Sequence, residues 1–126
     1  MSKIPAELSY TASHEWVAEK DGVYTIGLTD FAQDALGDLV FVNLPMEGDE
    51  VVAGEAFADV ESVKAVSDVF SPVTGTVVQI NEDLLDAPEA INEDPYGAWL
   101  VRVEEVSEVG DLLDADAYEA LCAQEA

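Results

Sequence analysis

Basic side chains are scarce in this sequence of 126 residues, which has 4 Lys and Arg against 28 Asp and Glu and a formal net charge of −24 at pH 7. Such a surface repels phosphate, which argues against nucleic acid and anionic membranes as partners. The acids are spread along the chain, so we expect a folded body with a solvated acidic shell. We interpret this composition as adaptation to high salt, which screens charge repulsion, and predict a halophilic source.

Cysteine and long apolar runs are also scarce. Cys122 is the only cysteine, which excludes an internal disulfide and fits a reducing cytosol. The stretch MSKIPAELSY lacks the apolar run of a signal peptide, and no segment approaches the roughly 20 apolar residues that cross a bilayer. We therefore expect a cytoplasmic protein. Because 49% of the residues are hydrophobic, we expect one domain over residues 1–126.

The first half of the chain predicts a hairpin followed by a short helix. The strand-like stretches EWVA and VYTIGL flank Asp21-Gly22, a dipeptide typical of tight hairpin turns. The next stretch, TDFAQDALG, has apolar residues at helical spacing, with Thr29 or Asp30 as N-cap and Gly37 as the C-terminal stop.

The rest of the chain predicts short strands separated by proline and glycine. The strand candidates are DLVFVNLP, DEVVAGEAFADVES, AVSDVFSPV, GTVVQIN and AWLVRVE. We expect one or two helical turns in EDLLDAPEAIN and a terminal helix in DLLDADAYEALCA, with Leu113, Ala117 and Leu121 on one face. This pattern favours a mainly β protein, a small sandwich or flattened barrel.

Lys64 lies between two of these strand segments. Only Lys3, Lys20, Lys64 and Arg102 are basic, and the segments on either side of Lys64 predict that it occupies the tip of a tight turn. A lysine amine on a flexible stem is the group through which proteins carry acyl cofactors by an amide bond, and a turn tip is accessible to a modifying enzyme. The alternative interpretation is an ordinary exposed charge.

The stretch VESVKAVSDVFSPVTGTVV resembles the lipoyl-attachment segment of the glycine cleavage system H-protein family. The order of SHEWV, TIGLTDFAQDALGDLVFVNLP, IN followed by PYG, and DAYEAL is also similar to that family, so the resemblance covers nearly the whole chain. It implies a lipoyl/biotinyl-type barrel-sandwich hybrid, or hammerhead, with short helices and a C-terminal helix. It also implies lipoic acid in amide linkage to Lys64, within the attachment motif formed by Glu61, Ser62, Val63 and Ala65.

By this resemblance the protein is a carrier and not an enzyme. The partners that the resemblance implies are a pyridoxal-phosphate glycine decarboxylase, which loads an aminomethyl group, a tetrahydrofolate-dependent aminomethyltransferase, which removes it, and dihydrolipoamide dehydrogenase, which reoxidises the dithiol. A lipoate ligase or lipoyl transferase would attach the arm. Ser13, His14, Glu15 and Asp68 are implicated in a cleft that shelters the loaded arm. The chain departs from the family at Ala35, where a histidine facing this cleft is frequent.

Two related functions stay open at this point. A biotinyl carrier, or a lipoyl domain of a 2-oxoacid dehydrogenase, shares the hammerhead fold. Biotinyl domains usually have methionines beside the lysine, whereas Val63 and Ala65 stand here. An H-like protein that relays lipoate, instead of taking part in glycine breakdown, is the other alternative.

Other chemistry has weaker signals. His14 is the only histidine and has no evident second metal ligand nearby, and Cys122 would meet it as a nucleophile only by coincidence of folding. The acid pairs lack the alternating ligands and central glycine of a calcium loop, so we predict no metal site. We place the large apolar side chains in the core, with a partner-docking patch as the alternative for one of them: Trp16, Trp99, Phe31, Phe41 and Leu44.

Overall fold

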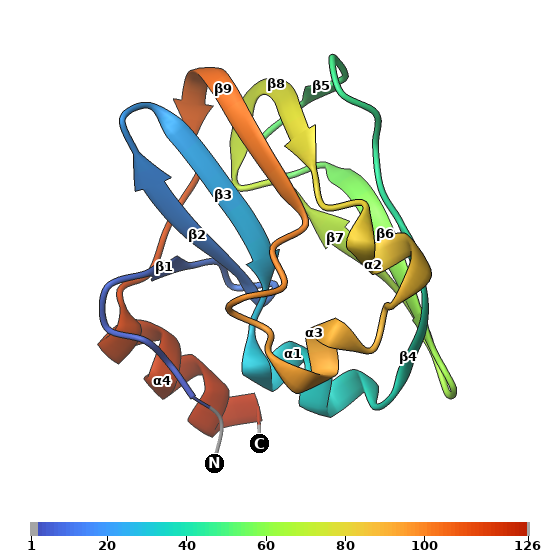
Figure 1. Cartoon of the computed structure of the whole chain (residues 1–126). Coiled ribbons are helices and arrows are strands. Elements are labelled where there is room, and N and C mark those ends of the chain that lie inside the picture. Colours follow the sequence, from blue (N-terminus) through green and yellow to red (C-terminus); the bar gives the residue numbers. More distant parts are fainter. Residues whose placement is uncertain (1–2, 126) are drawn as a thin grey trace.

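The computed structural model describes residues 3–125 and is mainly β (Figure 1). Its strands and helices follow the order expected from the sequence, except that β1 was not predicted and that the stretch DEVVAGEAFADVES forms two strands, β5 and β6. They are β1 (Ser9–Tyr10), β2 (Glu15–Lys20), β3 (Val23–Leu28), α1 (Asp30–Leu36), β4 (Leu39–Asn43), β5 (Glu50–Val51), β6 (Ala56–Ser62), β7 (Val66–Phe70), β8 (Val73–Ile80), α2 (Asp83–Asp86), α3 (Ala90–Glu93), β9 (Val101–Val109) and α4 (Ala115–Glu125).

The larger sheet has the strand order β1-β2-β3-β9-β8-β5, and all neighbouring strands are antiparallel. The predicted hairpin is confirmed, because β2 pairs with β3 from Glu15–Leu28 to Lys20–Val23. Asp21 and Gly22 both have positive φ, 53° and 83°, as a two-residue turn of this hand requires. The last strand, β9, pairs with both β3 and β8 and so joins the first three strands to β8 and β5.

The smaller sheet has the order β4-β6-β7 and contains the hairpin that carries Lys64 (Figure 1). Strand β6 pairs with β7, with Glu61 opposite Val66 and Asp59 opposite Asp68. Residues two apart on a strand share a face, so Asp59 and Glu61 lie on the same side of β6. The buried residue Val60 lies on the other side.

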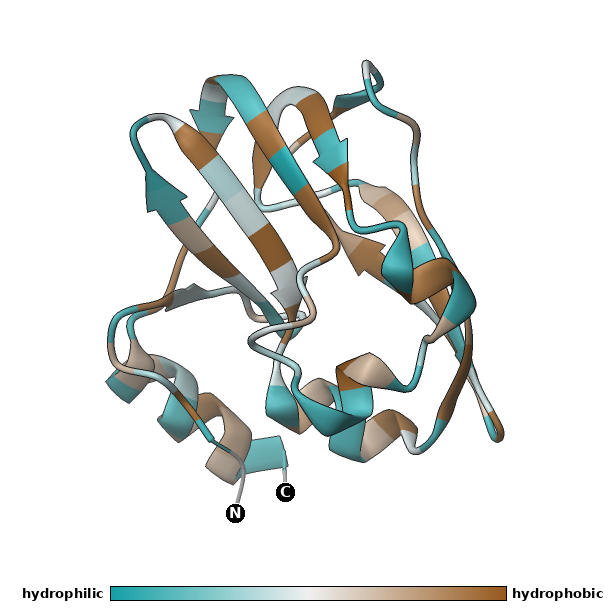
Figure 2. Cartoon of the chain, in the orientation of Figure 1, coloured by the Kyte–Doolittle hydropathy of each residue, from teal (hydrophilic) through white to brown (hydrophobic). Residues whose placement is uncertain are grey.

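Valine, isoleucine and leucine side chains from both sheets meet in one main core cluster, seen as brown segments on the strands in Figure 2. Ile26, Val60, Val69 and Val101 are fully buried there. The prediction that Phe41 belongs to the core is wrong, because 49% of it is exposed. A β-bulge between Leu39 and Phe41 breaks the simple alternation of β4 and turns Phe41 outward, opposite Glu61.

Helix α1 forms where its capping residues predict. The Thr29 side chain accepts a hydrogen bond from the Ala32 amide, and Gly37, with φ of 84°, ends the helix by donating its amide to the Gln33 carbonyl. A positive φ at this position is accessible to glycine without the penalty that a Cβ atom brings. The helix thus leads directly from β3 into β4.

Helix α4 covers a second apolar cluster, which includes Tyr10, Trp16, Tyr118 and Cys122. The predicted helix face is only partly right. Leu121 packs against this cluster, but Leu113 precedes the helix, which begins at Ala115, and Ala117 is exposed, while Tyr118 and Cys122 point inward. None of the helices within residues 3–125 has the length and hydropathy to span a membrane.

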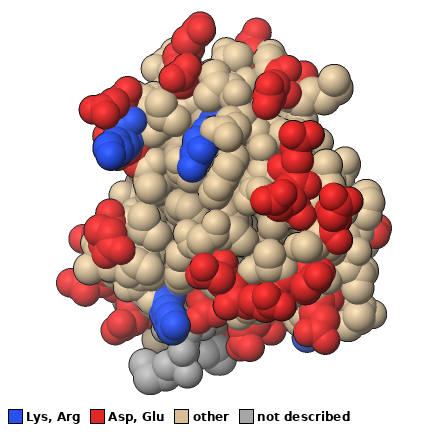
Figure 3. Space-filling model, viewed as in Figure 1, with Lys and Arg blue, Asp and Glu red and all other residues tan. Residues whose placement is uncertain are grey.

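Acidic side chains are spread over the surface, and few basic ones stand among them (Figure 3). Within the described part of the chain, the one ion pair joins His14 Nε2 to Glu125 Oε1 at 2.9 Å, and it is charged only when the histidine is protonated. The carboxylates are therefore neutralised mainly by solvent and its ions rather than by partner side chains.

Candidate functional site

Lys64 is exposed in the three-residue turn between β6 and β7, the position that the flanking strand pattern predicts. The Ser62 hydroxyl oxygen accepts hydrogen bonds from the amides of Lys64, at 3.2 Å, and Ala65, at 3.0 Å. The Ser62 amide in turn donates to the Ala65 carbonyl at 2.8 Å. A single serine thus fixes the backbone of the turn while the lysine side chain stays free of the sheet.

The stem of Lys64 lies over Gly37 at the end of α1. A Cβ atom added at Gly37 would stand 3.3 Å from Lys64 Cε and 3.8 Å from its Nζ. The Val63 amide donates to the Asp38 carbonyl at 3.1 Å, which joins the turn to the same segment. The carbonyl end of α1 is the end that favours cations, so this contact suits an unmodified lysine.

Glu61, Val63 and Ala65, which belong to the predicted attachment motif, surround the turn without burying the amine. Val63 is 70% exposed and Val66 is 67% exposed, which leaves apolar surface on both sides of Lys64. Glu61 is exposed on β6, and Ala65 is exposed in the turn. The turn therefore combines an accessible amine with an apolar and acidic surface that a modifying enzyme can contact.

Glu15 lies at the opposite end of β7, in a cleft of about 420 Å³. Its side chain is fully buried. Oε1 accepts hydrogen bonds from the hydroxyls of Thr11 and Ser13, both at 2.5 Å, and Oε2 accepts one from the Phe70 amide at 3.2 Å. The cleft is lined by Thr11, Ser13, Glu15, Ala53, Gly54, Phe70, Ser71, Pro72, Glu108, Val109, Gly110 and Asp111.

Burial dominates the electrostatics of this carboxyl group. Loss of solvation raises the pKa of Glu15, and the hydrogen bonds from Ser13, Thr11 and the Phe70 amide, together with the nearby His14, offset part of that rise. The three donors fix the position of this carboxyl group, and its ionised form would attract a cation that enters the cleft.

Strand β7 connects the two ends of this region. It runs from Val66, beside the Lys64 turn, to Phe70, whose amide contacts Glu15. That length is about 14 Å at the usual rise of a strand. Asp68 lies midway and is exposed, opposite Asp59, and it is not among the residues that line the cleft.

His14 points away from the cleft that holds its neighbours Ser13 and Glu15. Its ring stacks on Phe31 with centroids 4.7 Å apart. Nδ1 is 2.7 Å from the Tyr118 hydroxyl, and Nε2 is 2.9 Å from a carboxylate oxygen of Glu125. The sequence grouped Ser13, His14 and Glu15 together, but the structure brings only Ser13 and Glu15 into the cleft.

Comparison with known proteins matches nearly the whole of this chain. A sequence model of the glycine cleavage H-protein family matches residues 8–125. The chain belongs to this family. Glycine cleavage system H proteins of Lachnoclostridium phytofermentans and Idiomarina loihiensis are similar to it, at 56% identity over 98% of both chains and at 55% over 95% of this chain and 96% of the relative.

The fold agrees with this family. A glycine cleavage system H protein from Mycobacterium marinum has a crystal structure similar to this one, with a TM-score of 0.87, 45% identity, and coverage of 97% of this chain and 98% of that chain. The barrel-sandwich hybrid with a C-terminal helix, predicted from the sequence, is confirmed. So is the carrier role: H-family members are non-catalytic lipoyl carriers of the glycine cleavage system.

Three further features that the sequence raised are a metal site, the thiol of Cys122 and the position of Ala35. Within residues 3–125 no three His, Cys, Asp or Glu side chains are grouped so that they could hold a metal ion. Cys122 lies on the buried face of α4, and burial raises the pKa of its thiol, which disfavours a nucleophilic thiolate. Ala35 is exposed on α1, in the turn of helix that precedes Gly37.

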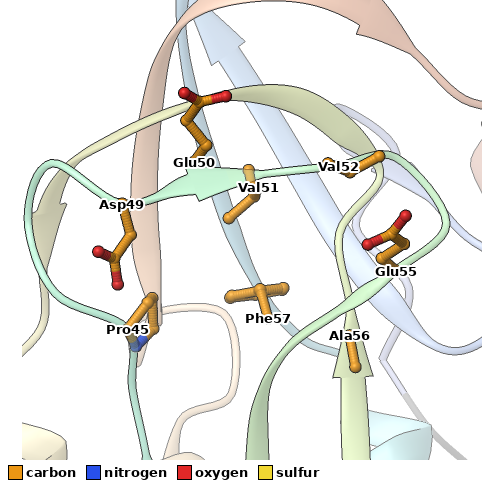
Figure 4. A pocket seen from close by; sticks show the side chains of 8 residues that line it. All are labelled: Pro45, Asp49, Glu50, Val51, Val52, Glu55, Ala56 and Phe57. Atoms are coloured by element: carbon orange, nitrogen blue, oxygen red, sulfur yellow. The ribbon is translucent and has the colours of Figure 1, made fainter.

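A second pocket, of about 350 Å³, lies between β5 and the start of β6 (Figure 4). Val51 and Phe57 line it, while Asp49, Glu50 and Glu55 stand at its rim. It lies at the Ala56 end of β6, whereas Lys64 follows the Ser62 end. Its acidic rim contains no buried and fixed carboxylate comparable to that of Glu15.

Sequence reasoning missed three contributors to the site. Thr11 and the Phe70 amide hold the Glu15 carboxylate, and Gly37 lies beneath the Lys64 stem. Gly37 had a visible signal, as a helix stop, but its contact with Lys64 depends on how the β6–β7 hairpin folds against α1. The Phe70 amide is a backbone group, and no side-chain pattern reveals it.

Proposed function

We propose that Lys64 carries lipoic acid through an amide bond and that the whole chain, residues 1–126, acts as one lipoyl-carrier domain. The observation that carries this proposal is an exposed lysine at the tip of the β6–β7 hairpin, inside the ESVKA segment of a chain that matches the H-protein family along its length. Lys20 also adjoins a hairpin turn, but it lies outside that segment.

The residues present fit such a group. Ser62 holds the turn rigid while the amine is exposed, and the cleft at the far end of β7 offers room and a fixed carboxylate. The bound group would supply thiol–disulfide exchange at its dithiolane ring, so the chain itself needs no nucleophile. The protein would contribute tethering, because a covalent arm reaches each docked enzyme at a high effective concentration.

Glu15 and Ser13 are the residues that we propose receive the loaded end of the arm. The cargo, an aminomethyl group, carries an ammonium charge, and the buried Glu15 carboxylate favours a cation in this cleft. The hydroxyl of Ser13 keeps the carboxylate oriented. Asp68, exposed on the strand that leads from Lys64 to the cleft, would attract the same cation on its way.

The partners that follow are the enzymes of glycine cleavage. We propose a pyridoxal-phosphate glycine decarboxylase, a tetrahydrofolate-dependent aminomethyltransferase and dihydrolipoamide dehydrogenase, with a lipoate ligase or lipoyl transferase for attachment. The net charge of −24 favours basic docking surfaces on these enzymes over nucleic acid or anionic membrane. A single buried free cysteine fits the reducing cytoplasm, where we place the protein.

Intact mass tests the attachment. Protein isolated from its native host should gain the mass of one lipoyl group, and a peptide map should place it on Lys64. The Lys20→Arg variant, which alters another exposed lysine beside a hairpin turn, should gain it equally. A native-host sample that stays unmodified, or that carries biotin instead, would refute the proposal.

Glycine–bicarbonate exchange, reconstituted with the lipoylated protein and the decarboxylase, tests the pathway. A glycine cleavage carrier should support exchange at a rate that rises with carrier concentration. A protein that only relays lipoate should be lipoylated and yet support none, and that outcome would replace glycine cleavage with the relay function.

We also propose that the acidic surface is an adaptation to high salt. It is supported by the excess of carboxylates over basic partners and by the scarcity of ion pairs within residues 3–125. Salt screens the repulsion among these carboxylates, so the urea midpoint should rise between dilute and molar potassium chloride. A fold that is equally stable in dilute buffer would contradict the adaptation.

A further inference from the structure

Two neighbouring residues, His14 and Glu15, point to opposite sides of the protein. The backbone of His14 has a φ of 73°, in the left-handed region that only a few per cent of non-glycine residues adopt. This conformation sends the Glu15 carboxylate into the cleft and the His14 ring to α4. A strained conformation persists when its surroundings fix it in several ways.

Contacts on every side fix His14. The ring lies between Phe31, on which it stacks, and Tyr118, whose hydroxyl is 2.7 Å from Nδ1. Glu125, at the end of α4, contacts Nε2 at 2.9 Å. The backbone is held as well, because the Thr29 amide donates to the His14 carbonyl at 3.1 Å.

The Tyr118 hydroxyl joins three elements. It contacts His14 from the loop before β2, and at 2.7 Å it contacts the Thr29 hydroxyl that caps α1. With the imidazole proton on Nε2, every group is satisfied: Thr29 donates to Tyr118, Tyr118 donates to Nδ1, and Nε2 donates to Glu125. The Tyr118 ring also stacks on Tyr10, at 4.6 Å and 7° between planes.

The start of α4 is tied to the same loop. Tyr10 and Leu113 exchange two backbone hydrogen bonds, at 2.8 and 2.7 Å, one residue before Thr11. Thr11 then contacts the Glu15 carboxylate directly. Segment 10–15 is thus held at both ends, at Tyr10 by Leu113, just before α4, and at His14 by Tyr118 and Glu125 of α4.

We infer that α4 positions the carboxylate of Glu15: by locking His14 in its left-handed conformation, Tyr118 and Glu125 hold Glu15 against the Phe70 amide and the hydroxyls of Ser13 and Thr11. His14 and Tyr118 are then positioning residues behind the cleft rather than residues that touch the arm. That the Glu15 carboxylate receives the cargo rests on the proposed function, whereas its positioning by α4 involves only residues of this chain.

The Tyr118→Phe variant tests the inference in unlipoylated protein. Removal of one hydroxyl should raise the amide exchange rate of Phe70 about fivefold, the factor expected when one hydrogen bond is lost. The titration of the Glu15 carboxyl, followed by its carbon-13 shift, should move toward the ordinary glutamate range as water enters.

Tyr96→Phe is the matched control. Tyr96 belongs to the same cluster, and its hydroxyl also contacts two groups, the Lys3 carbonyl and the Asp30 amide, but it makes no hydrogen bond to segment 10–15. It should leave both readouts at Glu15 and Phe70 unchanged. If Tyr118→Phe and Tyr96→Phe alter them equally, or if neither alters them, the inference is wrong.

His14→Asn provides an independent variant. Asparagine tolerates positive φ, so the fold should be retained while the contacts to Phe31, Tyr118 and Glu125 are lost. Phe70 exchange should rise as in Tyr118→Phe, and the double variant should add little to either single change. Additive effects would refute a common route through His14. A failure of lipoylation would instead refute the proposed function and leave these measurements intact.

Discussion

The turn that carries Lys64 and the cleft that holds Glu15 differ in almost every physical respect. Lys64 and the residues on either side of it are exposed, and the Ser62 hydroxyl holds their backbone. Glu15 is fully buried, and its carboxylate accepts three hydrogen bonds. One end is suited to enzymes that must reach an amine, and the other to a charge that must be kept from water. Variants that alter one end should therefore leave the chemistry of the other unchanged.

Lys64→Arg should have the largest effect, because a guanidinium cannot form the lipoyl amide. Lipoylation by a purified ligase and glycine–bicarbonate exchange should both be abolished. Folding should be unaffected to within about 0.5 kcal/mol, since the side chain is exposed. Lys20→Arg should behave as wild type, and residual exchange in Lys64→Arg would eliminate Lys64 as the attachment site.

Glu15→Gln should affect only the cleft and not the attachment of the lipoyl group. Lipoylation should proceed normally, while the aminomethyl group on the loaded carrier should be lost about tenfold faster, because a hydrogen bond to a charged group contributes about 1.5 kcal/mol. Release of formaldehyde and ammonia measures this loss. Glu108→Gln, an exposed position in the same cleft, is the control and should change the lifetime little. Equal lifetimes for wild type and Glu15→Gln would remove Glu15 from the sheltering role.

The raised pKa of Glu15 also predicts how stability depends on pH. The folded state binds the Glu15 proton more tightly than the unfolded state, so ionisation favours unfolding. Between the ordinary glutamate value, 4.5, and the higher folded pKa, stability relative to Glu15→Gln should fall as pH rises. The slope is at most about 1.4 kcal/mol per pH unit. Urea unfolding of both proteins across this range measures it, and a difference that is flat or rises would contradict the assigned burial.

Ser62→Ala should have the smallest effect. It removes the oxygen that accepts from the Lys64 and Ala65 amides and should cost about 1 kcal/mol of stability. The turn would loosen, and the initial rate of lipoylation should fall modestly while the lifetime of the cargo stays unchanged. Ser67→Ala, whose hydroxyl makes only a 3.4 Å contact to the Asp68 carbonyl, is the control. A shortened cargo lifetime in Ser62→Ala would show that the two ends are not independent.

Local chemistry explains which features could be predicted from sequence. The Asp21-Gly22 turn, the α1 caps and the exposed position of Lys64 follow from residues adjacent in the chain, and all three are confirmed. Phe41 was misplaced because a bulge in β4 shifts the periodic pattern, and Ala117 because the face of α4 that is buried depends on the distant Tyr10 and Trp16 against which Tyr118 and Cys122 pack. The direction of the His14 ring depends on a helix more than a hundred residues away, and alternation along the chain cannot reveal it.

Asp68 lies on β7, an outer strand of the smaller sheet, and stands opposite Asp59 on β6. An unpaired strand edge is a template for pairing with another chain, and it becomes a poor one when it presents like charges. The facing carboxylates weaken the hairpin slightly, yet a second molecule that tried to extend the sheet there would bring a further row of negative charge. The strand beside Lys64 is thereby a poor template for aggregation, even though the exposed Val63 and Val66 flank that turn.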